Sequence, residues 1–279
     1  MALWSGRFTE GADAFTQRFG ASLPVDQRLY AEDIEGLTKQ YPGFTLDSVS
    51  FSIGEGRIMG LIGRNGAGKT TTLKAILNMI TPQRGRIQIL GHEFPAEERT
   101  CKQMLGVVLG GIDFYMQKKL SDITKVTRRF YEYWDDAKYE HYMRSFNLDA
   151  GKRVKELSSG MRVKYLIALA LSHGARLLIL DEPTSGLDPV SREELLELFR
   201  CMAGEDGISI LFSTHITSDL EKCADDITYL KSGKVLESAA KTKFVRLFQD
   251  IYAPGSTELT LEDIMLYAEK ERRDYEFAL

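Results

Sequence analysis

The sequence predicts an α/β fold in which helices flank a mainly parallel β-sheet, and three runs of residues carry this prediction. The apolar run Ile58 to Ile62 leads into a glycine-rich loop and then a helix-like segment. A second apolar run, Leu177 to Leu180, ends in two acids, and a third, Ile208 to Phe212, precedes a lone histidine. Continuous apolar runs are typical of strands buried on both faces, and strands that alternate with helices indicate an α/β architecture.

The composition is that of an ordinary globular protein without a nucleic-acid-binding face. The 279 residues are 43% hydrophobic and 27% charged, with a net charge of −4 and a pI near 5.7. Readers of nucleic acid usually present a basic surface, so we expect no nucleic-acid partner. Three widely spaced cysteines predict reduced thiols, and the sequence contains neither a membrane-spanning run nor a secretory signal. We therefore expect a cytoplasmic protein.

Residues 63–70 match in full the phosphate-binding pattern G-x-x-x-x-G-K-[ST], between a strand and a helix. Glycines let this backbone curl so that its N–H groups point at phosphate oxygens, and the helix start adds about half a positive charge. Lys69 is placed to reach the β- and γ-phosphates, and the Thr70 hydroxyl to hold Mg²⁺. The predicted nucleotide-binding residues of this loop are Gly63, Asn65, Gly66, Ala67, Gly68, Lys69, Thr70 and Thr71.

The two acids after the second strand complete the expected phosphate chemistry. Asp181 is placed to bind the water shell of Mg²⁺, and Glu182 to polarise a water molecule that attacks the γ-phosphate. Two acids at a strand end are weak evidence alone because strand ends often expose carboxylates. Together with the glycine loop they predict a nucleotide-hydrolysing site.

Further motifs give a resemblance to the nucleotide-binding subunit of ABC transporters. Leu157-Ser158-Ser159-Gly160-Met161 lies upstream of the acidic strand, and the block 177–189 reads LLILDEPTSGLDP. The phosphate loop, this signature, the Ser-Gly-Leu-Asp loop and His215 follow that family's order over about residues 34–238. The resemblance implies an ATPase with a P-loop NTPase fold: a RecA-like, mainly parallel sheet core, an antiparallel β edge subdomain, and a helical signature subdomain over about 113–175.

The resemblance also assigns roles one residue at a time. Tyr41 resembles the aromatic residue that stacks on adenine, although a strand-end tyrosine can also simply cover the core. Ser158 and Gly160 resemble the signature residues that touch the γ-phosphate of an ATP bound to the opposite subunit. His215 resembles the switch histidine that senses the γ-phosphate, and so joins Lys69 and Glu182 as a catalytic candidate. Asp188 resembles the dimer-contact residue and can cap a helix that starts at Pro189.

Two positions depart from the family pattern. The signature has Ser159 and Met161 where a Leu-Ser-Gly-Gly-Gln sequence is usual. Gly110-Gly111 stands where the family places a glutamine that contacts Mg²⁺ and relays movement to the membrane partner. Three explanations stay open for the second departure: Asp113 substitutes for the glutamine, the backbone makes the relay, or hydrolysis is slow.

The two ends of the chain need separate explanations. The tail, residues 239–279, reads as helical packing, with Thr260 as the cap of a Leu-Glu-Asp-Ile helix resembling one in exporter-type subunits. The head, up to about Gly36, instead resembles the start of argininosuccinate lyase in its Leu-Trp-x-Gly-Arg-Phe and Asp-Gln-Arg-Leu runs. That enzyme's serine-rich signature loop has no counterpart downstream. We therefore expect residues 1–33 to be a fusion, a gene-joining artefact or an expression appendage.

Three functional hypotheses follow. The leading one is the ATPase subunit of a bacterial ABC exporter, peripheral on the inner face of the membrane, dimeric, and paired with a separate transmembrane permease. The second is a soluble, non-transport ABC ATPase of the iron–sulfur assembly type, and the third, resting on the head alone, is argininosuccinate lyase. The aromatic-rich stretch 114–146, in which Phe130, Trp134 and Met143 recur at rough helical spacing, is expected to form a helical-subdomain core, a contact face for the permease, or both.

Overall fold

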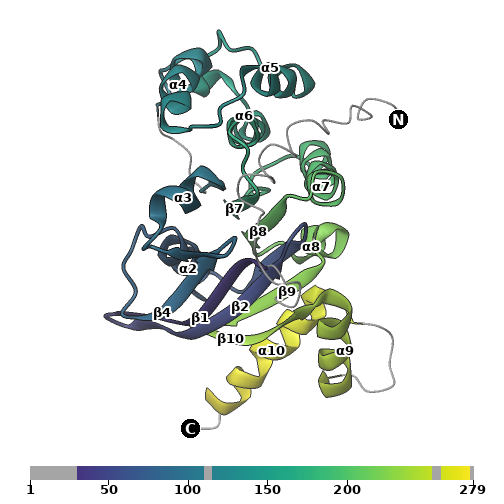
Figure 1. The fold of residues 1–279 in the computed structure, drawn as a ribbon. Helices are drawn as coiled ribbons and strands as arrows, with labels where there is room; N and C mark the ends of the chain where they lie inside the picture. Colours follow the sequence, from purple (N-terminus) through teal and green to yellow (C-terminus); the bar gives the residue numbers. More distant parts are fainter. Residues whose placement is uncertain (1–29, 110–114, 253–258, 277–279) are drawn as a thin grey trace.

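The computed structural model describes residues 30–109, 115–252 and 259–276, and within these ranges the predicted α/β architecture is confirmed (Figure 1). The strands are β1 (Tyr30–Tyr41), β2 (Phe44–Gly54), β3 (Ile58–Ile62), β4 (Arg84–Ile89), β5 (His92–Phe94), β6 (Leu105–Val108), β7 (Leu177–Asp181), β8 (Ser209–Thr214), β9 (Asp226–Lys231) and β10 (Lys234–Ala240). The α-helices are α2 (Lys69–Ile76), α3 (Glu98–Gln103), α4 (Leu120–Thr127), α5 (Asp136–Ser145), α6 (Ser159–Ser172), α7 (Pro189–Gly204), α8 (Thr217–Cys223), α9 (Lys241–Tyr252) and α10 (Leu261–Glu276), with short 3₁₀ turns η1 (Arg128–Phe130) and η2 (Val154–Glu156).

The larger sheet positions the phosphate loop and the acidic residues at the carboxyl ends of its parallel strands. Its strand order is β10-β9-β3-β8-β7-β6; all neighbours are parallel except the edge strand β10. Every residue of β3, β7 and β8 is buried, as expected for parallel strands covered on both faces. Ile62 pairs with Thr214 and Asp181 with Ser213, so the three strands end side by side. The residues that follow these strands therefore lie close together at the carboxyl ends of the strands.

The two faces of this sheet belong to separate hydrophobic cores. Along β7, Leu178 and Leu180 pack into the core that includes helices α6 to α10, whereas Leu177 and Ile179 face the core shared with α2 and the second sheet. This alternation is the period of two expected for side chains along a strand. Both faces of β7 must therefore be apolar, which explains its unbroken apolar sequence.

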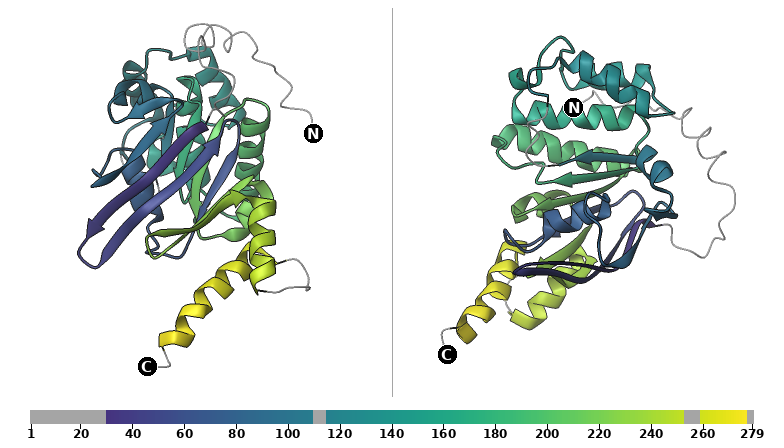
Figure 2. Two further views of the ribbon diagram at one scale, coloured as in Figure 1. Left: turned by 60° about the horizontal axis from the view of Figure 1, so that its bottom comes forward. Right: turned by 90° about the vertical axis from the view of Figure 1, so that its left-hand side faces the viewer.

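The second sheet is antiparallel, in the order β2-β1-β4-β5, and Tyr41 lies at the end of its strand β1. Figure 2 shows this sheet and the helices α4 to α6 at opposite ends of the molecule. Strand β1 begins at Tyr30, before the predicted domain start at residue 34, and Ala31 and Glu32 are fully buried. Residues 30–33 therefore belong to the sheet. Of the predicted N-terminal extension, residues 1–29 lie outside the described ranges.

The predicted helical subdomain contains α4, α5 and α6. Its interior is held by aliphatic and aromatic side chains and by a hydroxyl chain in which Thr124 contacts both Tyr139 and Tyr165 at 2.9 Å. Met143 is buried, and Trp134 packs partly buried against the same core. The expectation that Phe130 belongs to this core is wrong, because 71% of its surface is exposed. Phe130 lies in the short turn η1, where no helix carries its side chain inward.

The tail forms two helices that close the core on the β9–β10 side. Thr260 caps α10 as predicted: its hydroxyl accepts from Asp263 N at 3.1 Å, and its backbone N–H donates to the Asp263 carboxylate at 3.1 Å. Leu261, Ile264 and Ala268 bury one face of α10. Across the ranges that the structure describes, no helix combines the length and apolar character that a membrane span requires.

Candidate functional site

The phosphate loop of residues 63–70 is a tight backbone cradle between β3 and α2. Gly63 has φ of 154°, and a Cβ there would lie 2.3 Å from the Leu230 carbonyl oxygen, so only glycine fits. Gly68 has φ of 113° and precedes the first turn of α2. Two backbone bonds brace the loop: Ala67 N donates to Arg64 O at 3.0 Å, and Gly233 N donates to Ala67 O at 2.9 Å. The loop is therefore held from inside and from the β9–β10 turn.

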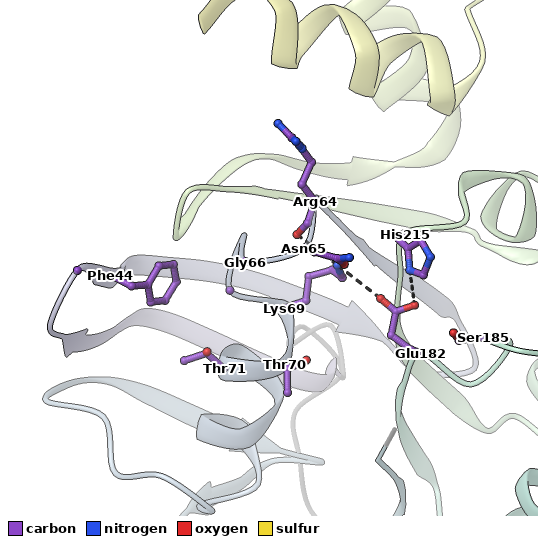
Figure 3. Close-up of a pocket in the computed structure, with 12 residues that line it drawn as sticks. Phe44, Arg64, Asn65, Gly66, Lys69, Thr70, Thr71, Glu182, Ser185 and His215 are labelled. Carbon is purple, nitrogen blue, oxygen red and sulfur yellow. Dashed lines mark hydrogen bonds and ion pairs between the residues drawn. The ribbon is translucent and has the colours of Figure 1, made fainter. Parts of the chain in front are cut away.

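Lys69 lies deep in this loop. Its side chain is 6% exposed, and Nζ donates to Gly63 O at 2.8 Å. The same ammonium group lies 3.6 Å from Glu182 Oε1 (Figure 3). A buried cation inside a glycine-rich loop at the start of a helix is suited to polyphosphate binding.

Glu182 turns back into the site at the end of β7. Its φ of 51° is unusual for a residue other than glycine, and such conformations gather at functional sites. The bond from Glu182 N to Ser213 O, 3.0 Å, holds this turn against β8. Glu182 Oε2 lies 2.7 Å from His215 Nδ1, so its carboxylate bridges His215 and Lys69 (Figure 3). The arrangement brings a carboxylate, an imidazole and an ammonium group together in one place.

Asp181 and Thr70 place oxygen atoms that are suited to ligating a metal ion beside this cluster. The Thr70 hydroxyl donates to Asp181 Oδ2 at 3.0 Å, and the Ser213 hydroxyl donates to the other carboxylate oxygen. Mg²⁺ prefers oxygen ligands and is usually held by one or two protein groups together with substrate phosphates. A hydroxyl and a carboxylate that converge next to a phosphate loop fit this requirement.

Lys69, Thr70, Glu182 and His215 line one pocket of about 700 Å³ (Figure 3). Its lining includes eight of the predicted site residues, namely Asn65, Gly66, Gly68, Lys69, Thr70, Thr71, Glu182 and His215. Predicted residues outside the lining are Tyr41, Gly63, Ala67, Ser158, Gly160, Asp181 and Asp188. The pocket also takes in residues that the sequence reasoning did not assign, namely Gly43, Phe44, Arg64 and Ser185.

The aromatic wall of the pocket is Phe44 rather than Tyr41. The two residues face each other across the β1–β2 turn, where they are paired. Phe44 lines the pocket beside Gly68, whereas Tyr41 is 40% exposed and has the Lys39 ammonium 5.5 Å from its ring centroid. A signal for Phe44 was available, since it is the first residue after the Pro42-Gly43 turn and alternates with the buried Leu46.

Ser158 of the signature and Asp188 of the Ser-Gly-Leu-Asp loop lie outside the pocket lining, although Ser185 of that loop belongs to it. Ser158 caps α6 by accepting from Met161 N at 3.2 Å, and Asp188 caps α7 by accepting from Val190 N and Ser191 N, both at 3.0 Å. Hydrogen bonds from Ser191 lower the pKa of Asp188. The Ser159 hydroxyl donates to Gly186 O at 3.3 Å and so links the two loops. The glycine pair 110–111 and Asp113 lie outside the described residues.

Comparison with known proteins agrees with this geometry. Residues 46–185 match the family model for the ABC transporter. The chain is 33% identical over 204 residues to the bacitracin transport ATP-binding protein of Bacillus licheniformis, covering 72% of this chain and 67% of that protein. It is 34% identical over 213 residues to the Nod factor export ATP-binding protein I of Neorhizobium galegae, covering 74% of this chain and 61% of that protein. The solved ATP-binding subunit of an ABC transporter superposes with a TM-score of 0.74 at 27% identity, covering 85% of this chain and 98% of that one.

The family match, the shared fold and the assembled phosphate site lead to the same assignment. The cassette of this family binds and hydrolyses ATP, and the predicted fold class is that of its solved members. The chain belongs to the ATP-binding, ATP-hydrolysing subunits of ABC transporters.

Proposed function

We propose that this chain powers a bacterial ABC exporter whose membrane subunit is a separate polypeptide. The observation that carries the proposal is the meeting of Lys69, Glu182 and His215 around one pocket. The names of the related bacitracin transport and Nod factor export proteins support the exporter class. The chain would then act on the inner face of the membrane, attached through its partner. The alternatives of an iron–sulfur assembly ATPase and an argininosuccinate lyase gain no support from these relatives.

Within the pocket, each side chain has a role that its position suggests. Lys69 would neutralise charge on the β- and γ-phosphates, and His215 would contact the γ-phosphate while it orients Glu182. Glu182 would take the proton of the attacking water. Thr70 and Asp181 would hold Mg²⁺, which when bound neutralises charge on the phosphate oxygens. Catalysis would then consist of positioning and charge stabilisation.

ATP-binding subunits of this family dimerise and work with transmembrane subunits. The separation of the Ser158–Asp188 surface from the pocket supports a head-to-tail arrangement in this chain. Each signature would then face the nucleotide held by the phosphate loop of the other copy. The Ser158 hydroxyl and the N-terminus of α6 are suited to an anion. Both halves of such a site are present in one chain, so two copies suffice to build it.

Exposed apolar side chains in β6 and in residues 115–133 support docking of the membrane subunit in this part of the chain. These large side chains are Val107, Tyr115, Val126, Phe130 and Tyr133. Exposed apolar patches on a globular protein mark contact sites for protein or membrane. A helix presented by a permease would bury these side chains.

Replacing Phe44 by alanine is expected to raise the KM for ATP about tenfold with little change in kcat. Loss of one base-stacking aromatic costs about 1–3 kcal/mol, and Phe44 is the aromatic residue that lines the pocket. Steady-state ATPase assays on Phe44→Ala and Tyr41→Ala compare the two candidates. A larger KM effect for Tyr41→Ala would instead assign the adenine contact to the residue suggested by family resemblance.

The exporter proposal is tested by a pull-down from detergent-solubilised source membranes with the Glu182→Gln chain and ATP, read by mass spectrometry. We expect a polytopic membrane protein in stoichiometric amount, because the variant should remain in its ATP-bound form. Recovery of soluble partners alone, or of none, would contradict the exporter proposal and favour a cytosolic ATPase. The Phe130→Asp variant is a matched control, since it should lose the membrane protein while it retains ATPase activity.

A further inference from the structure

The phosphate loop is tied to the C-terminal helix by one ion pair that the site chemistry does not use. Arg64, the second residue of the loop, extends its guanidinium away from the pocket floor and toward α10 (Figure 3). Its Nη1 lies 3.4 Å from Glu269 Oε2. The second carboxylate oxygen of Glu269 accepts from the Tyr229 hydroxyl at 3.1 Å. Glu269 therefore bridges the phosphate loop and β9.

Glu269 is the fixed partner of this pair. Ala268, next to it, is buried, and its carbonyl oxygen accepts a hydrogen bond from Lys231. The Glu269 side chain is 22% exposed, whereas the Arg64 side chain is 62% exposed. The packing of α10 and the bond from Tyr229 thus hold the carboxylate in place, and Arg64 reaches out to meet it.

Arg64 has a fixed backbone and a movable side chain. Its carbonyl oxygen accepts from Ala67 N at 3.0 Å and from Lys69 Nζ at 3.4 Å, which anchors the residue inside the loop. The residue nevertheless belongs to the pocket lining. A guanidinium group binds phosphate oxygens in a fork geometry that suits a polyphosphate. One long side chain can therefore serve either the nucleotide or α10.

An exposed ion pair contributes little to the stability of the fold. What matters for this pair is therefore whether the Arg64 guanidinium is directed toward the phosphate site or toward Glu269. We infer that Arg64 is an auxiliary nucleotide-binding side chain and that Glu269 competes with the nucleotide for its guanidinium. The helix α10 then lowers ATP affinity by withholding one cation from the phosphate site. This inference rests on the ATPase function of the pocket and adds a restraint from the C-terminal helix.

The test measures equilibrium binding of a fluorescent ATP analogue to the full chain. Glu269→Gln is expected to tighten binding about two- to fivefold, the range that an exposed charge pair allows. Arg64→Ala is expected to weaken binding by a similar factor. Adding Glu269→Gln to Arg64→Ala should then leave the affinity for the analogue unchanged, because the guanidinium for which Glu269 competes is absent. Glu262→Gln, the same charge change on an exposed residue in the first turn of α10, is the matched control.

Salt dependence separates this role from a merely structural one. The difference between the wild-type chain and Glu269→Gln should disappear in 1 M salt, where exposed charges are screened within about 3 Å. Unchanged or weaker binding by Glu269→Gln, in a variant with the wild-type melting temperature, would overturn the inference. If that variant does not fold, equal affinities of Arg64→Ala and the wild-type chain would overturn it. Failure of the wild-type chain to bind the analogue would instead overturn the ATPase assignment.

Discussion

The Glu182→Gln variant is expected to bind ATP as tightly as the wild-type chain while its turnover falls about 10²- to 10⁴-fold. That factor is the usual contribution of a positioned general base. Glutamine has the shape of glutamate, so it can keep the turn at the end of β7 and the contact with His215, 2.7 Å away in the wild-type chain. It cannot accept the proton of the attacking water. Phosphate release and equilibrium ATP binding measure the two quantities separately.

The same variant should also accumulate as a closed dimer when ATP is present. Removal of the carboxylate leaves the phosphate loop and Lys69 unchanged, so ATP can still join two copies, but it is not consumed. Size-exclusion chromatography with and without ATP detects the change in mass. Glu197→Gln, on the exposed side of α7, is the control and should match the wild-type chain in every assay. Turnover of Glu182→Gln within twofold of the wild-type rate would contradict the assignment of Glu182 as the general base.

Replacing Glu32 by leucine is expected to stabilise the fold by about 3 kcal/mol at pH 7. Glu32 lies in β1, paired with Ile53 and Ile89, and is fully buried. Among the described residues, neither of its carboxylate oxygens has a hydrogen-bond partner. Burial raises its pKa from 4.5 to about 8. Folding at pH 7 therefore requires Glu32, which is ionised in the unfolded chain, to take up a proton. This proton uptake costs about 1.4 kcal/mol for each pH unit above 4.5.

The pH dependence follows from the direction of this pKa shift. Below pH 4.5, Glu32 is protonated in both states and carries no ionisation penalty. As the pH rises from 4.5 to about 8, the unfolded state ionises first, and the fold loses stability through this range. Glu32→Gln should remove that slope because its side chain does not titrate. Urea unfolding at pH 5, 7 and 8.5 measures it.

Glu35→Gln provides the matched control for the unfolding series. Glu35 lies on the same strand and is exposed, so its replacement should leave the slope unchanged. Equal slopes for Glu32→Gln and the wild-type chain would show that Glu32 is solvated in solution. A loss of stability in Glu32→Leu would lead to the same conclusion, because leucine fits a buried site of this size.

Local patterns were sufficient to predict the parts of the site that depend on neighbouring residues. The phosphate loop, the acidic pair at the end of β7, and the caps at Asp188 and Thr260 all act over a few positions along the chain. Their geometry is set by backbone turns and helix ends, which leave a clear composition signal. The strand assignments were equally accessible because β3 is apolar throughout and β7 and β8 are apolar over most of their length.

The missed residues depend on contacts between distant segments. Phe44 becomes a pocket residue only because the β1–β2 turn is brought to the phosphate loop. Ser213 supports Asp181 from the neighbouring strand, and Glu269 reaches Arg64 from the far end of the chain. The burial of Glu32 contradicts the usual location of glutamate and depends on the sheet order. No local rule predicts the contacts of Ser213 and Glu269 or the burial of Glu32, whereas the position of Phe44 after the Pro42-Gly43 turn offered a partial signal.

Residues 30–36 close the stretch that resembles argininosuccinate lyase, and the same residues open strand β1. Their place in the sheet is made by main-chain bonds, such as the one from Leu90 N to Ala31 O at 3.0 Å, and by the alternation that buries Ile34. Main-chain hydrogen bonds do not depend on the identity of the side chains, so different sequences can form the first residues of such a strand. The first residues of β1 are therefore fixed in the sheet by backbone register and by the burial of one face, whichever family their sequence resembles.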